Sequence, residues 1–184
     1  PLISRVAQTG KPIIISTGIA DLQDIHLALE TCRKAGNDNI VLLKCVSEYP
    51  TPYEELNLKT IQNMTETFEC ITGLSDHSLG NAVAIAGVTL GAKVIEKHLT
   101  LKRSDGGPDS SFSMEPDEFK QMVDDVRNIE HALGKVTYQL TDKQKKSKGR
   151  SRSLYVVEDI KKITQNPIYT NNYAYIFNGV IGGF

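Results

Sequence analysis

The 184 residues contain no tryptophan, only three cysteines, and no surplus of either charge, with 21 Lys and Arg against 22 Asp and Glu. This balance provides no basic surface for a nucleic acid backbone, so we expect no nucleic acid partner. No run of about 18 apolar residues occurs, which predicts no membrane-spanning helix. Cys32, Cys45 and Cys70 are odd in number and lack metal-site spacing, which is typical of reduced thiols in a cytoplasmic protein.

The N-terminus lacks a secretory signal pattern. It begins with Pro1 rather than methionine, so we expect a piece of a longer chain. With 40% hydrophobic and 23% charged residues, the composition is that of an ordinary globular protein. The length suits one domain followed by a tail.

A short apolar run followed by a segment of helical periodicity repeats four times. The apolar runs are Ile13–Ile15, Ile40–Leu43, Ile71–Leu74 and Val94–Ile95, and the helical segments are Asp21–Ala35, Tyr53–Phe68, Leu79–Leu90 and Glu115–Leu133. Short runs without alternation fit strands buried on both faces, as in a parallel sheet. The pattern therefore predicts a (β/α)4 arrangement, either an open doubly wound sheet or half of an eightfold barrel. No Gly-x-Gly-x-x-Gly follows any run, which disfavours a dinucleotide-binding sheet.

Polar residues cluster where the predicted strands end. They are Ser16, Ser47, Ser75, His77, Glu96 and His98. Parallel α/β folds bind ligands at the carboxyl ends of their strands, so these residues predict an active site there.

His77 and His98 occupy equivalent positions at two consecutive strand ends. Neighbouring strands lie about 4.8 Å apart, so two imidazoles there can reach one divalent ion. The alternative is a pair of unrelated, hydrogen-bonded histidines. The serines offer hydroxyls beside helix starts, which attract anions such as phosphate, although helix capping also explains them. The Gly-rich segment Arg103–Asp109 fits either an ordinary turn or a loop that closes over a substrate.

Five segments resemble the sialic acid synthase family. They are KPIIISTG (11–18), YPTPYEE (49–55), GLSDHSLG (73–80), GAKVIEKHLT (91–100) and GGPDSSFSMEPDEF (106–119). LGKV and RSLYVVEDIKK extend the likeness to Lys162, and RSDGGPDSSFSMEP is more similar to the pseudaminic branch than to the N-acetylneuraminate branch.

The resemblance implies an α/β fold, a TIM-type (β/α)8 barrel followed by a small antifreeze-like (SAF) domain. Members condense phosphoenolpyruvate with an amino sugar, in the pseudaminic branch 2,4-diacetamido-2,4,6-trideoxy-altrose, and release phosphate. It implies that a divalent metal, Mn or Mg, is held by His77 and His98. The phosphoenolpyruvate contacts fall on Ser16, Ser47 and Ser75. The remaining catalytic positions, Tyr49 and Asp109, line the sugar and metal site.

The resemblance also predicts the organisation of the chain. Residues 1–138 would be the second half of the barrel, 139–152 a basic solvated linker, and 153–184 a partial antifreeze-like domain. Phe177 stands where the family has an arginine, and the residues after Lys162 fit the family poorly. We expect a homodimer for the complete enzyme, and an inactive, marginally stable half-barrel for the chain alone. The alternatives are an N-acetylneuraminate or legionaminate synthase, or a non-catalytic remnant.

Overall fold

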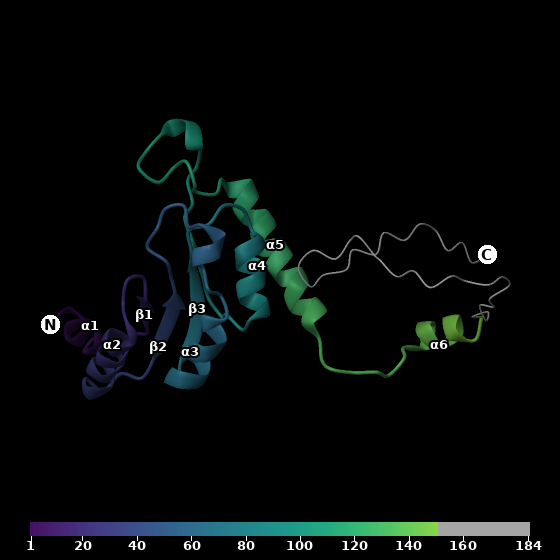
Figure 1. Ribbon diagram of the computed structural model, residues 1–184, viewed down its shortest axis with the longest axis horizontal. Coiled ribbons are helices and arrows are strands. Elements are labelled where there is room, and N and C mark those ends of the chain that lie inside the picture. The colour runs from purple at the N-terminus through teal and green to yellow at the C-terminus, as the bar shows by residue number, and fades with distance from the viewer. Residues whose placement is uncertain (151–184) are drawn as a thin grey trace, which may run out of the picture. The chain divides into compact units, whose positions relative to one another are not determined.

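Four strands form one parallel sheet in the computed structural model, which describes residues 1–150 (Figure 1). They are β1 (Ile13–Ser16), β2 (Ile40–Lys44), β3 (Ile71–Asp76) and β4 (Ile95–Lys97), in the order β1-β2-β3-β4. The helices α2 (Leu22–Lys34), α3 (Thr60–Phe68) and α4 (Ala82–Thr89) join them, and α5 (Pro116–Leu133) follows β4. An open doubly wound sheet reverses its strand order at a switch point. This sheet does not, so the predicted (β/α)4 half-barrel is confirmed.

The helices cover one face of the sheet. Leu42 and Leu74 point to that face and are fully buried, Leu42 among residues of α2 and α3 and Leu74 against α3 and α4. Burying a leucine side chain stabilises a fold by about 1.5–3 kcal/mol. Gly87 on α4 packs closely, since an added Cβ would lie 2.9 Å from the Leu74 side chain. These contacts pack the helices against the sheet.

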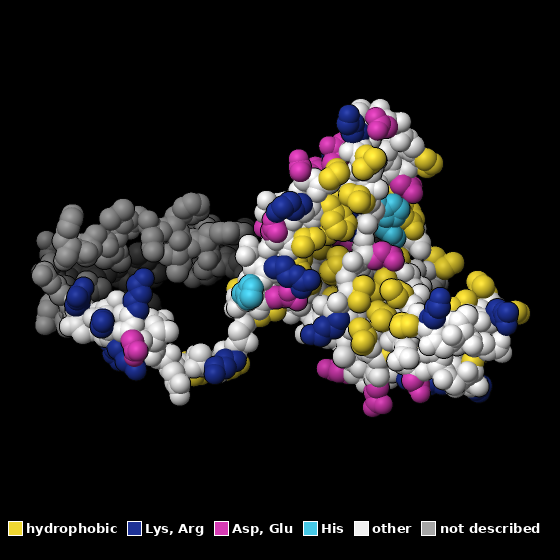
Figure 2. Space-filling model, turned by 180° about the vertical axis from the view of Figure 1, so that it is seen from behind, with side chains coloured by type: hydrophobic (Ala, Val, Ile, Leu, Met, Phe, Trp, Pro, Cys, Tyr) yellow, Lys and Arg dark blue, Asp and Glu magenta, His cyan; other side chains and the backbone are white. Residues whose placement is uncertain are grey.

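The opposite face of the sheet lacks such a cover within residues 1–150. Ile14 on β1 and Ile71 on β3 are 56% and 54% exposed, although strand residues of this kind are usually buried. Figure 2 shows hydrophobic side chains gathered over one face of the protein, with a histidine at the edge of the group. In a closed barrel this face is the interior and is filled by side chains from all strands.

The predicted limits of α2 and α5 are confirmed to within one residue, whereas α4 begins three residues later than predicted and the segment 53–68 is wrong. Asp21 caps α2, and Glu115 precedes α5 in a capping box. The segment predicted as one helix over 53–68 is instead a 3-10 turn, η1 (Tyr53–Glu55), followed by α3. Asn57 lies between them with φ 46°, a left-handed conformation that ends a helix and that asparagine tolerates.

Three further helical elements lie outside the repeat within residues 1–150. α1 (Leu2–Ala7) precedes the sheet, and a second 3-10 turn, η2 (Arg103–Asp105), begins the loop after β4. The chain divides into two units, 1–136 and 137–184. Within the second unit, the basic stretch expected to be a linker contains α6 (Asp142–Lys148), whose residues are all exposed.

The antifreeze-like domain expected at 153–184, with Phe177, lies outside the described residues, and the domain limits remain predictions. Among residues 1–150, no helix combines the length and the apolar character needed to span a membrane.

Candidate active site

A hollow of about 580 Å³ opens at the carboxyl ends of the four strands. Six of the seven residues predicted for the site line it, namely Ser16, Ser47, Tyr49, Ser75, His77 and His98. Ser16 ends β1, Ser75 lies on β3, and both histidines follow directly after a strand. Strand residues two apart share a face, so Ser75 and His77 point to the same side. The sheet therefore brings together residues that lie up to 82 positions apart in the sequence.

His77 is oriented by the backbone of the neighbouring strand end. Its Nδ1 lies 2.9 Å from the carbonyl oxygen of Val46. A carbonyl only accepts, so Nδ1 carries a proton, and in the neutral imidazole Nε2 keeps its lone pair. Ser75 Oγ is 3.5 Å from Nε2, at the outer limit for a hydrogen bond. The Nε2 lone pair is thus free to bind a ligand within the hollow.

An aromatic cluster surrounds the two histidines. The ring centroids of His77 and His98 are 5.1 Å apart. Tyr49 lies 4.2 Å from His77, and Phe112 lies 5.1 Å from His98. Phe112 is almost completely buried. These packed rings restrict the imidazoles, and Tyr49 also lines the hollow.

Glu96 is a site residue for which the sequence indicated a position but no role. Ser75 Oγ donates a hydrogen bond of 2.7 Å to Glu96 Oε1, from β3 to β4. The exposed carboxylate lines the hollow with the serines. Phe112 was not predicted at all, because its only signal was one aromatic residue in the loop before α5.

Asp109 is the predicted residue that does not line this hollow. Its Oδ2 lies 3.7 Å from His98 Nδ1, too far for a hydrogen bond but close enough for an ion pair when the imidazole is protonated. The residue is on the loop between η2 and α5, which contains Gly106 and Gly107 at positive φ.

Gly18 leaves the hollow open beside Ser47. It has φ +37°, and an added Cβ would lie 2.7 Å from Ser47 Oγ. Only glycine combines this backbone conformation with this close approach. The strand-end loop after β1 can therefore run past Ser47 without filling the site.

The donor chemistry fits a divalent metal ion held by two imidazoles. Imidazole nitrogen is a common ligand for first-row transition metals, and the Val46 carbonyl holds His77 in the tautomer that such binding needs. Within residues 1–150, no group of three or more His, Cys, Asp or Glu could hold a metal. Water or substrate oxygens would have to complete the coordination.

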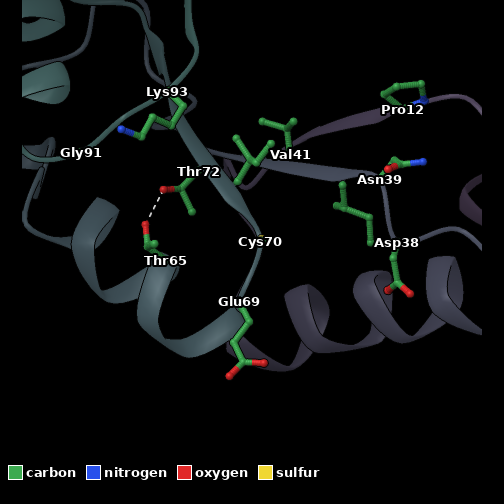
Figure 3. Close-up of a pocket in the computed structure, with 12 residues that line it drawn as sticks. Pro12, Asp38, Asn39, Val41, Thr65, Glu69, Cys70, Thr72, Gly91 and Lys93 are labelled. Atoms are coloured by element: carbon green, nitrogen blue, oxygen red, sulfur yellow. Dashed lines mark hydrogen bonds between the residues drawn. The ribbon is translucent and has the colours of Figure 1, made fainter. Parts of the chain in front are cut away.

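A second hollow, of about 600 Å³, lies at the amino ends of the strands (Figure 3). Thr65 on α3 and Thr72 on β3 face each other there and share a hydrogen bond of 2.5 Å. Cys70 is partly exposed in this hollow. Barrel enzymes carry their chemistry at the carboxyl ends, and the amino ends serve stability. We therefore place the active site in the first hollow.

A parallel half-barrel with its polar side chains gathered at the strand ends places the fold in the TIM-type (β/α) class. Residues 1–138 match the model of the NeuB family. The chain belongs to this family of sialic acid synthases.

Named relatives agree with this assignment. The chain is 46% identical over 160 residues to the pseudaminic acid synthase of Campylobacter jejuni serotype O:2, covering 87% of this chain and 47% of the relative. It is 41% identical over 165 residues to the N,N'-diacetyllegionaminic acid synthase of the same organism, covering 88% and 49%. The chain thus spans about half the length of these relatives.

A solved structure supports the same fold. It is the N-acetylneuraminic acid synthetase from Leptospira borgpetersenii serovar Hardjo-bovis in complex with citrate. It superimposes with a TM-score of 0.72 at 32% identity, over 81% of this chain and 52% of that one.

Proposed function

We propose that this chain forms half of a synthase that condenses phosphoenolpyruvate with an amino sugar to give a sialic-type acid and phosphate. The observation that carries the proposal is the gathering of Ser16, Ser47 and Ser75 beside His77 and His98 in one hollow. Hydroxyl groups suit an anionic substrate, and the strand-end position is where barrel enzymes bind ligands. Family membership supports the same reaction class.

The reaction forms one carbon–carbon bond and one carbon–oxygen bond, the latter from water, and breaks the carbon–oxygen bond to phosphate. C3 of the enolpyruvate attacks the aldehyde carbon of the sugar, and the aldehyde oxygen takes up a proton to become a hydroxyl. Water adds at C2 of the former enolpyruvate. The tetrahedral intermediate then releases inorganic phosphate by cleavage of its C2–O bond, which leaves a keto group.

The residues of the hollow suit different parts of this reaction. Ser16 and Ser47 would donate to the oxygens of phosphoenolpyruvate, and Tyr49 would restrict the sugar from the apolar side. His77 and His98 would hold Mn or Mg, which as a Lewis acid would polarise the aldehyde. Asp109, beside His98, is placed to exchange a proton with a sugar oxygen.

Within the family we propose the pseudaminic branch, with 2,4-diacetamido-2,4,6-trideoxy-altrose as the sugar. The higher identity to the pseudaminic acid synthase than to the legionaminic acid synthase of the same organism supports this choice. An N-acetylneuraminate or legionaminate synthase is the alternative.

Activity in this proposal requires four further strand–helix units to close the barrel. The exposed Ile14 and Ile71 would then become interior, and the unpaired backbone groups of the edge strands β1 and β4 would find partners. We expect the chain alone to be inactive and prone to aggregate, and the complete enzyme to be a homodimer.

Phosphate release tests the proposal. The chain is assayed alone and fused behind the first half of the Campylobacter pseudaminic acid synthase. Each protein is given the altrose derivative, or the sugar substrate of an N-acetylneuraminate synthase or of a legionaminate synthase, with or without EDTA. We expect release only from the closed barrel, only with the altrose derivative, and none after EDTA treatment. Release with another sugar would move the chain to another branch. A folded fusion that releases no phosphate with any sugar would favour the non-catalytic remnant.

A further inference from the structure

The two strands that carry the histidines are also joined by a buried ion pair. Lys97 Nζ lies 2.7 Å from Asp76 Oδ2, and the two side chains are 1% and 0% exposed. Asp76 directly precedes His77, and Lys97 directly precedes His98. Asp76 and Lys97 are also paired residues in the register of β3 with β4. Each histidine therefore follows one member of the ion pair.

The hydrogen bonds of this pair extend to the residue on the other side of His77. Asp76 Oδ1 accepts from Ser78 N at 2.8 Å and from Ser78 Oγ at 2.6 Å. Lys97 Nζ donates to Ser78 O at 2.7 Å. The residues before and after His77 are thus tied together and to β4. This closed network fixes the backbone from which the His77 ring projects.

The ion pair and the active-site residues lie on opposite faces of the sheet. Ser75 and Glu96, one position earlier on each strand, bond across the hollow. Alternation places Asp76 and Lys97 on the helix-covered face. The end of the β3–β4 ladder is therefore linked on both faces, once by a hydrogen bond and once by an ion pair.

A buried ion pair is a poor means of stabilising a fold, because removing two charges from water offsets their attraction, and well-packed apolar replacements are often as stable. Such a pair instead allows only one arrangement of the two strand ends that carry it. We propose that Asp76 and Lys97 are positioning residues that set the separation and orientation of His77 and His98. This inference rests on the proposed metal site for its functional meaning.

The test uses the closed-barrel fusion described above, carrying the paired substitution Asp76→Asn/Lys97→Met, which removes both charges and nearly keeps their volumes. The matched control is Lys120→Met/Asp124→Asn, an exposed ion pair on α5. The first measurement is the ring-to-ring nuclear Overhauser effect between His77 and His98 in histidine-labelled protein without metal. The second is Mn²⁺ affinity by electron paramagnetic resonance.

We expect the paired variant to melt cooperatively, to lose the ring-to-ring signal, and to bind Mn²⁺ about 10- to 100-fold more weakly, as when residues that support metal ligands are changed. The control should keep both properties. A folded paired variant with the signal and the affinity of the parent would overturn the proposal. If the parent binds no Mn²⁺ but the variant still loses the signal, positioning is supported and the metal proposal fails.

A milder variant covers the case in which the paired variant does not fold. Ser78→Ala removes only the hydroxyl that donates to Asp76 and keeps the ion pair. It should weaken the ring-to-ring signal and lower Mn²⁺ affinity several-fold while the melting temperature changes little. Parental values for both quantities would overturn the proposal.

Discussion

His77 donates through Nδ1 to the carbonyl oxygen of Val46, so the loop after β2 orients a side chain that follows β3. This contact selects one tautomer and leaves Nε2 facing the hollow. The site is therefore prepared by the backbone before any substrate arrives. Its chemistry depends on the pairing of two strands as much as on the identity of the side chain.

The first prediction concerns the histidine pair. His77→Ala should weaken Mn²⁺ binding by more than about 100-fold, because it removes a ligand rather than a group that supports one. Calorimetric titration of the closed-barrel fusion measures the affinity. His131→Gln, on the exposed end of α5, is the control and should bind as the parent does. Equal affinity in the two variants would exclude His77 as a ligand.

A second prediction separates backbone strain from blockage of the site. Gly18→Ala and Gly36→Ala each place a Cβ at positive φ, but only the Cβ at Gly18 meets another side chain, Ser47 Oγ at 2.7 Å. Both should lose roughly 1 kcal/mol of stability. Only Gly18→Ala should also lose phosphoenolpyruvate affinity in the closed barrel, measured by calorimetry. Similar binding losses in both variants would mean that the serine side is not where the anion binds.

A third prediction concerns the close approach inside the half-barrel. An added Cβ on Gly73 would lie 2.4 Å from the backbone oxygen of Val94 and 2.6 Å from a methyl of Leu43. Gly73→Ala should lower the free energy of unfolding by about 1–3 kcal/mol or more, as overpacking does. Urea denaturation gives the value. Gly149→Ala, whose nearest neighbour would be 3.6 Å away, should change it little, and equal losses would contradict the packing argument.

A fourth prediction uses Cys70 at the amino end of the sheet. Burial raises the pKa of its thiol above the ordinary 9.0, so less thiolate is present at any pH below that value. Alkylation should be slower than for a free cysteine near pH 8 and should speed up only at higher pH. Mass spectrometry of labelled peptides follows the reaction. Closing the barrel should slow it further, and unchanged labelling would show that this end stays open.

Much of the fold follows from local pattern. Apolar runs such as Ile13–Ile15 between amphipathic segments predict parallel strands, because both faces of such strands are buried. Strand order does not follow from periodicity, so the half-barrel could be told from an open sheet only by the observed pairing. The break at Asn57 was missed because its left-handed backbone has no periodic signal.

The position of the site was predictable from the sequence, but the contacts between its residues were not. The sequence puts His77 and His98 at strand ends, and this is where the structure has them. It does not reveal that Ser75 bonds to Glu96, or that Phe112 packs on His98 from a loop. Such contacts depend on register and loop path, which are set by long-range packing.

The alternation of side chains on β3 also disfavours pairing of β3 with β4 in the wrong register. If β3 slipped by one residue against β4, every side chain would change faces. His77 would turn under the helices, and Asp76 would leave Lys97 as an uncompensated charge in an apolar layer, which is strongly unfavourable. A sheet with the wrong register would therefore be strongly destabilised by an unpaired buried charge. The residues beside the histidines select the correct fold as well as the correct site.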